Sequence, residues 1–277
     1  MKRILINLAL IVTITIVWVL TCFFGTVNGW WHTPFTNETD PQSFVEAVEE
    51  EIQKEYVGNF AMAIIKEGRI EEEVFYSVGK PVDRNTIFQV ASLSKFVSAT
   101  GVMKLNELGK IDLDTPVSRY LTRWQLPPSE FDNEQVTARR LLSHTAGLTD
   151  GLGYSGFETP DAVQTLEASL TKAADADEGK SGETKVGIEP NSSWVYSGGG
   201  FTLLQLLVEE TSEQSFDTFM KENVFAPLQM TQSTYEWSDS LGDDLCEFYN
   251  ADGTKAPHFF YTSLAATSLY TSLADLE

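Results

Sequence analysis

A serine and a lysine three residues apart, Ser92 and Lys95, constrain this chain more than any other feature. On a helix, residues at this spacing share one face with Cβ atoms roughly 5–6 Å apart, so the amine can take the proton of the serine hydroxyl. Ser94 is a poor nucleophile candidate because adjacent helical residues do not face each other. The pattern therefore predicts a helix that begins close to Ser92.

The sequence around this pair predicts that the helix is largely buried. An apolar segment, 87–91, leads directly into Ser92. Apolar residues then recur from Phe96 to Leu108, and Gly109 is a typical helix end. Burial lowers the pKa of a lysine from about 10.4, which a base for serine requires. Backbone N–H groups at the start of the helix could also supply part of an oxyanion hole.

The same spacing occurs a second time, at Ser169 and Lys172. An acidic stretch, 175–179, follows this copy, so we expect Lys172 to stay hydrated and protonated. The sequence therefore favours Ser92 over Ser169 as the nucleophile.

A tyrosine far downstream fits the first pair. Tyr196 begins the sequence Tyr-Ser-Gly-Gly-Gly after a polar turn, 189–193, and an apolar segment, 201–210, predicts a helix behind it. A phenol on such a braced turn can lie near a lysine and relay protons. Tyr-Ser-Gly occurs again at 154–156, but no helical run follows that copy.

Together these segments resemble the serine β-lactamase and penicillin-binding-protein superfamily, in its class C-like branch of β-lactamase-related hydrolases. The segments in the family's order and spacing are 88–95, 111–117, 141–148, 196–201 and 227–231. The resemblance extends over roughly residues 45 to 277. It implies that the active site lies between two parts of the fold, an antiparallel sheet flanked by helices and a second, mostly helical lobe.

By this resemblance Ser92 is the acylated nucleophile, Lys95 its proton partner and Tyr196 the general base, with no metal and no cofactor. Gly198 takes the third, substrate-binding position of the family's Tyr-x-Asn motif and lacks its side-chain amide. The expected substrate is an ester, an amide, or a D-amino-acid peptide of peptidoglycan type or related β-lactam, with penicillinase-type recognition less favoured. The alternative is a catalytically inactive, membrane-anchored relative that acts as a binding or regulatory module.

The family's third motif, Lys-Thr-Gly or His-x-Gly, does not follow Tyr196 in this sequence. In the family this motif lies on a C-terminal strand opposite the nucleophile and supplies the second oxyanion N–H. The last segment, 268–277, resembles the middle of the family's fold. We therefore expect an incomplete domain with its C-terminal strands missing, and an inactive chain as given.

The order of the other elements predicts an α+β fold. Residues 43–56 predict an amphipathic helix, and 59–65 and 74–78, joined through Gly68, predict a hairpin. Strands and helices thus occur in separate blocks, which suggests an antiparallel sheet flanked by helices, with a second, mostly helical lobe.

The N-terminus predicts export. Two basic residues, 2–3, precede an uncharged, mostly apolar segment, 4–24, about long enough to cross a ~30 Å hydrocarbon core. We favour an uncleaved membrane anchor over a signal peptide, whose apolar region is about 7–15 residues. Either one places the catalytic domain outside the cell, anchored or secreted. Residues 1–29 are then the anchor or signal peptide, 30–42 a linker, and 43–277 the domain.

Charge and cysteine content exclude other classes. A net charge of −21 repels nucleic acid, so we expect no nucleic-acid partner. The two cysteines, Cys22 and Cys246, fall in the leader and in the domain, so no disulfide can close within the domain.

Two further patterns point elsewhere. Gly151 to Gly156 spells a dinucleotide fingerprint, but no strand precedes it and no helix opens there, so we expect a loop. His144 could be the base of a Ser-His-Asp triad. We expect instead a structural residue at a helix end, because Lys95 and Tyr196 already fill the base roles.

Overall fold

The computed structural model describes residues 2–30, 36, 40–55, 57–151 and 153–277, and it forms two compact units, Met1–Lys54 and Glu55–Glu277. Each unit is described by itself. The domain boundaries expected at residues 29 and 42 stay predictions, and most of the expected linker lies outside the described residues.

The first unit consists of two helices. Helix α1, Lys2–Val27, is apolar on all sides, and its segment Ile6–Val27 has the length and hydropathy to cross a membrane. A signal sequence passes the same test. Helix α2, Pro41–Glu55, is amphipathic, and the Asp40 carboxylate accepts the Ser43 N–H at 2.9 Å before its first turn. The helix predicted at 43–56 is present at Pro41–Glu55, and residue 56 lies outside the described residues.

The second unit begins with a β-hairpin. Strand β1, Phe60–Lys66, pairs antiparallel with β2, Arg69–Tyr76. Glu67 and Gly68 form its tight turn with φ values of 51° and 74°, the left-handed backbone that such two-residue turns require. The hairpin was expected, but its second strand starts earlier than Val74, because pairing with β1 outweighs the low strand propensity of three consecutive glutamates.

Helix α3, Ser94–Glu107, follows a short strand and a 3₁₀ turn; the turn carries Ser92, and the first turn of the helix carries Lys95. Strand β3, Phe88–Gln89, pairs antiparallel with β4, Tyr270–Thr271, and the 3₁₀ turn spans Ala91–Leu93. The helix ends where predicted, with Gly109 at φ 68°. One face departs from the expected burial, since Phe96 is 76% exposed.

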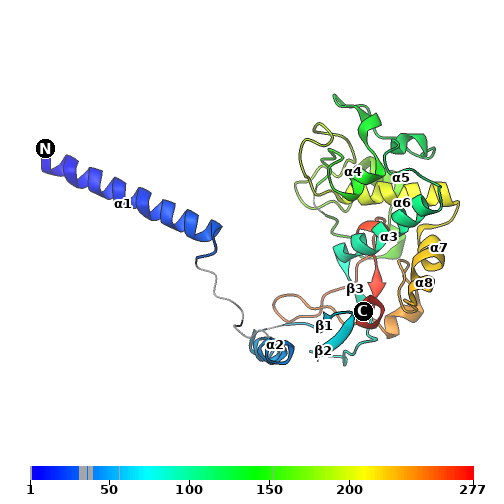
Figure 1. Cartoon of the computed structure of the whole chain (residues 1–277), viewed down its shortest axis with the longest axis horizontal. Coiled ribbons are helices and arrows are strands. Elements are labelled where there is room, and N and C mark those ends of the chain that lie inside the picture. Colours follow the sequence, from blue (N-terminus) through cyan, green and yellow to red (C-terminus); the bar gives the residue numbers. More distant parts are fainter. Residues whose placement is uncertain (1, 31–35, 37–39, 56, 152) are drawn as a thin grey trace. The chain divides into compact units, whose positions relative to one another are not determined.

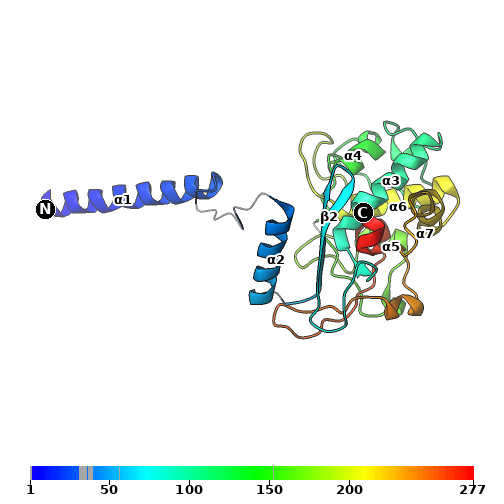
Figure 2. The same ribbon diagram turned by 60° about the horizontal axis from the view of Figure 1, so that its bottom comes forward.

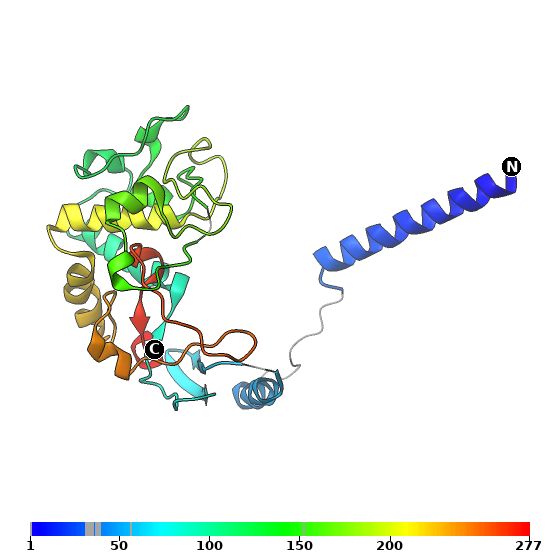
Figure 3. The same ribbon diagram turned by 180° about the vertical axis from the view of Figure 1, so that it is seen from behind.

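The core of this unit forms around α6, Gly198–Ser212, whose residues from 198 to 208 are all buried. Helix α6 contacts α3, α4, α5, α7 and α9, and Figures 1 and 3 show it crossing the helical part of the unit. The other helices are α4 (Ala138–Leu142), α5 (Leu166–Lys172), α7 (Phe216–Met220), α8 (Ala226–Leu228), α9 (Leu264–Thr267) and α10 (Leu273–Leu276), with a π-helical turn at Lys221–Phe225.

The hairpin lies to one side of these helices, as Figure 2 shows for β2. Strands and helices thus occur in separate blocks along the chain, which confirms the predicted α+β class with a mostly helical second part. The start of α3, the segment before α6 and the segment around α9 meet where Ser92 is exposed and Lys95 is buried, and this meeting point places the candidate site.

Candidate active site

Ser92 lies in a tight turn that is fixed from both sides. Ala91 adopts the left-handed conformation with φ 44°, which typically costs of order 1–3 kcal/mol for a residue other than glycine. The Val90 N–H donates to the Leu269 carbonyl at 2.9 Å. Fully buried Ser94 also ties the turn to this segment, because its hydroxyl donates to the Ala91 carbonyl and accepts the Leu269 N–H at 2.9 Å. The Ser94 hydroxyl is thus engaged in two backbone hydrogen bonds, whereas the Ser92 hydroxyl takes part in neither of them.

The amine of Lys95 reaches the Ser92 hydroxyl. Lys95 Nζ donates to Ser92 Oγ at 3.1 Å and to the Ala266 carbonyl of α9 at 2.7 Å, and the residue is 8% exposed. Burial lowers the pKa of Lys95 from its usual value, although a hydrogen bond with Tyr196 and the charge of Asp150 partly oppose this. The helix start therefore holds a lysine with weakened proton affinity against a serine, as the spacing predicted.

Tyr196 completes the group. Its hydroxyl donates to Ser92 Oγ at 2.8 Å, and Lys95 Nζ lies 4.9 Å from the centre of its ring. Three groups from distant parts of the sequence thus converge on one oxygen atom. An amine and a phenol within hydrogen-bond distance of a serine hydroxyl can together remove its proton and return it to another atom.

Asp150, a residue that the sequence did not single out, anchors the turn after Tyr196. Ser197 is the N-cap of α6: its hydroxyl accepts the Gly200 N–H at 2.8 Å and donates to Asp150 Oδ1 at 2.5 Å. Asp150 Oδ2 accepts the Gly199 N–H at 2.8 Å. Burial raises the pKa of Asp150, and these hydrogen bonds partly oppose the rise. An isolated aspartate in a polar loop gives no periodic signal, so only the serine before the helix hinted at this cap.

His144 contacts the same turn. It follows α4 with φ 56°, and its Nδ1 accepts the Ser197 N–H at 3.2 Å. Its ring lies 4.6 Å from that of Tyr196 and 5.4 Å from that of Phe201. Burial and the charge of Lys95 lower the pKa of His144, so the ring is held neutral as an acceptor. These contacts fit the expected structural residue at a helix end.

Gly198 is the first residue of α6 and is buried. A Cβ built at this position would lie 2.8 Å from Cε2 of Tyr154. The space beside Tyr196 that a side chain at 198 would need is therefore filled by an aromatic ring.

The competing patterns form no second site. Ser169 is buried on α5 while Lys172 is exposed, as expected for the second serine–lysine pair. The described residues around Tyr154, 153–156, form a loop that bridges to Ala176, and no helix begins among them. Within the described ranges, no cluster of three or more His, Cys, Asp or Glu residues has the arrangement of a metal site.

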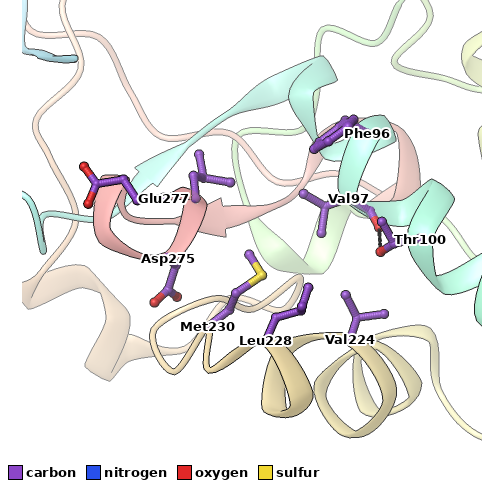
Figure 4. Close-up of a pocket in the computed structure, with 9 residues that line it drawn as sticks. Phe96, Val97, Thr100, Val224, Leu228, Met230, Asp275 and Glu277 are labelled. Carbon is purple, nitrogen blue, oxygen red and sulfur yellow. Dashed lines mark hydrogen bonds between the residues drawn. The ribbon is translucent and has the colours of Figure 1, made fainter. Parts of the chain in front are cut away.

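Two apolar hollows lie near the start of α3, and neither is lined by Ser92, Lys95 or Tyr196. One lies between α3, the π-helical turn, α8 and α10, and Figure 4 shows the side chains around it. The other borders the Ser92 turn through Ala91 and Leu93 and continues along Ala61–Ala63 of β1. The candidate site is thus defined by convergent hydrogen bonds rather than by either hollow.

Known structures share this fold. The octameric penicillin-binding protein homologue from Pyrococcus abyssi superimposes with a TM-score of 0.68 at 25% identity, over 86% of this chain and 55% of that one. For the D-alanine carboxypeptidase AmpC from Burkholderia cenocepacia the TM-score is 0.66 at 24% identity, over 85% and 61% of the two chains. These likenesses place the chain in the β-lactamase/transpeptidase-like fold class.

Sequence comparison agrees. Penicillin-binding protein 4* of Bacillus subtilis (strain 168) is 33% identical over 154 residues, which cover 56% of this chain and 32% of that protein. The chain therefore spans less than two thirds of each of these three proteins. The family model described as Beta-lactamase matches residues 44–276. The chain belongs to the β-lactamase family.

Proposed function

We propose that this chain is an exported serine hydrolase that works through an acyl-enzyme on Ser92. The observation that carries the proposal is the convergence of Lys95 Nζ, at 3.1 Å, and the Tyr196 hydroxyl, at 2.8 Å, on Ser92 Oγ. Two proton-transfer groups on one serine hydroxyl are what nucleophilic catalysis by serine needs.

In the proposed mechanism, Lys95 and Tyr196 share the proton of Ser92. Ser92 Oγ attacks the substrate carbonyl carbon while its proton passes to the lysine–tyrosine pair. The phenol then returns the proton to the leaving group as the carbonyl–leaving-group bond breaks, and an acyl-enzyme remains. Water, deprotonated by the same pair, attacks the acyl carbon and releases the acid and free Ser92. Because the base must be unprotonated, the lowered pKa of Lys95 supports this role.

Charge on the carbonyl oxygen needs donors in the transition state. We propose that backbone N–H groups at the start of α3, next to Ser92, provide part of this stabilisation. Removing a single oxyanion donor typically costs about 10²–10³ in kcat.

The surroundings of Tyr196 favour esters, or peptides with D-amino acids, over β-lactam antibiotics as substrates. Gly198 offers no side-chain donor, and the ring of Tyr154 fills the adjoining space. Trp194 is 65% exposed, with its ring 6.2 Å from that of Tyr196, and presents an aromatic surface close to the reacting atoms. A similar structure carries the name D-alanine carboxypeptidase, which adds the D-alanyl peptide to the candidates.

We propose that α1 holds the catalytic unit at the outer face of the cell membrane. Its segment Ile6–Val27 has a mean hydropathy of 2.4 and almost all of its residues are exposed to the surroundings. An apolar helix with no protein cover is stable in lipid. Secretion after cleavage of this segment is the alternative, and N-terminal sequencing of the exported protein separates the two.

The test is burst kinetics of the full-length protein with a nitrophenyl ester, a D-alanyl-D-alanine peptide and a chromogenic cephalosporin. The proposal predicts a burst of product close to one equivalent of chain with the ester or the peptide, and a weaker reaction with the cephalosporin. Ser92→Ala should abolish the burst, while the matched control Ser169→Ala should keep it. Turnover that survives Ser92→Ala would refute the proposal, and binding without any burst would favour the non-catalytic module.

A further inference from the structure

The second Tyr-Ser-Gly sequence of the chain, at 154–156, packs directly on the first. A Cβ on Gly198 would meet three atoms of the Tyr154 ring at 2.8, 3.3 and 3.5 Å. Side-chain Cβ atoms essentially never come within 3.0 Å of a ring carbon. The Tyr154 ring therefore requires glycine at position 198, which is two residues after Tyr196.

Tyr154 is fixed in this position at both of its ends. Its hydroxyl hydrogen-bonds with Thr202 Oγ1 at 2.9 Å, and the same oxygen bonds with the buried hydroxyl of Ser263. Its backbone bridges to Ala176, and the next residue, Ser155, donates its N–H to the Asp175 carbonyl at 2.7 Å. A ring held at both ends is a rigid surface and not a flexible side chain that moves aside.

Two rings thus contact the turn that carries Tyr196. The His144 ring lies 4.6 Å from that of Tyr196, and its Nδ1 accepts the Ser197 N–H. The Tyr154 ring occupies the space where a Cβ on Gly198 would lie. Because the backbone between Tyr196 and Gly198 is short, a shift of Gly198 displaces the Tyr196 hydroxyl from Ser92.

We propose that Tyr154 is a positioning residue that holds the Tyr196 hydroxyl against Ser92 Oγ by packing on Gly198. The expected effect on the reaction rate rests on the proposed function. The expected position of the Tyr196 hydroxyl does not. It assigns a role to a loop residue far from Tyr196 in sequence, which the repeated spelling alone does not reveal. It also explains why position 198 needs a glycine although its backbone is helical.

The test is a double-mutant cycle on Tyr154→Ala and Gly198→Ala in the full-length protein. The measured rate is that of Ser92 labelling by a fluorophosphonate. Each single substitution is expected to slow labelling about 10- to 100-fold, since a misplacement near 1 Å can cost about 10²-fold. In the double variant the new methyl group enters the space left by the ring. If the two residues act independently, the fold-losses of the single variants multiply in the double variant. Because the residues are in contact, the double variant should label at least about tenfold faster than that product predicts.

Three further variants or measurements keep the cycle interpretable. Tyr154→Phe keeps the ring and loses the Thr202 bond, so it should be the mildest change at this position. Gly242→Ala is the glycine control: a Cβ there would lie 3.3 Å from the Trp237 ring, which must give by only a few tenths of an ångström, so this variant should label like the wild type. Crystal structures of the wild type and of Tyr154→Ala give the distance from the Tyr196 hydroxyl to Ser92 Oγ, 2.8 Å here, without any reaction.

The inference predicts that this distance lengthens beyond hydrogen-bond range in Tyr154→Ala. An unchanged distance, or single effects that simply multiply in the double variant, would overturn it. A lengthened distance in a protein whose wild type fails to label would uphold the positioning role and refute the proposed function instead.

Discussion

Replacing Tyr196 by phenylalanine removes one oxygen from the candidate site and leaves the other contacts of the ring in place. The ring would still lie 4.6 Å from that of His144 and beneath Lys95 Nζ, 4.9 Å from its centre. What is lost is the hydroxyl that donates to Ser92 Oγ at 2.8 Å. The substitution therefore separates proton transfer from packing.

The two effects have different sizes. A hydrogen bond of this kind contributes about 0.5–1.5 kcal/mol to folding, and this one is solvent-accessible, so the free energy of unfolding should fall by about 1 kcal/mol or less. Loss of a general acid–base group lowers the rate by about 10²–10⁴. At about 1.36 kcal/mol per factor of ten, that is roughly 3–5 kcal/mol in the transition state. Expressed as free energies, the loss of transition-state stabilisation should be several times larger than the loss of folding stability.

The assay combines the acylation rate, from the ester burst, with urea unfolding of the same preparations. Tyr120→Phe is the matched control, because its hydroxyl accepts the Asp112 N–H at 2.9 Å and takes no part in the proposed site. It should lose a similar amount of stability and keep the acylation rate. A Tyr196→Phe variant that acylates within about threefold of the wild type would refute the proton-transfer role.

Three further predictions follow from the surroundings of the site. Ser94→Ala strips a buried hydroxyl from two backbone partners, so urea unfolding should show a loss of about 1–3 kcal/mol while the serine label stays in place. The pKa of His144 is lowered below its usual 6.5, so the unfolded chain binds this proton more tightly; stability should fall as the pH drops from about 6.5 through the lowered pKa. His144→Asn, which can still accept the Ser197 N–H, should lose this part of the pH dependence of unfolding, and an unchanged dependence would contradict the assignment. The charge of Asp150 raises the pKa of Lys95, so Asp150→Asn should move the rising limb of the acylation pH–rate profile towards lower pH, and a limb that stays in place would count against Lys95 as the base.

Local patterns were enough to predict the helix that begins at the serine–lysine pair. The apolar run into Ser92, the spacing to Lys95 and the glycine at 109 each act within a few residues, and the structure has the helix at Ser94–Glu107. The turn and the apolar helix around Tyr196 singled this residue out, but its role as the general base came from the family resemblance, because its contact with Ser92 joins segments 104 residues apart. Periodicity carries no information about such pairs.

What the sequence did not predict depends on long-range packing. Asp150 acts through backbone N–H groups at the start of α6, and a lone aspartate in a loop has no pattern that announces a cap partner. Tyr154 was set aside as a copy of the Tyr196 motif without a helix behind it. Its ring nevertheless fills the space at Gly198, a contact that only the folded chain reveals. The early start of β2 at Arg69 likewise follows from pairing with β1 and not from local propensity.

The central claim is that Ser92 is an activated nucleophile, and the most direct test is to find which serine a fluorophosphonate modifies. Intact mass spectrometry of the labelled full-length protein should show one adduct per chain, and peptide mapping should place it on Ser92. Labelling should be lost in Ser92→Ala and in Lys95→Ala but retained in Ser169→Ala. An adduct on any other serine, or no adduct on a folded protein, would contradict the account.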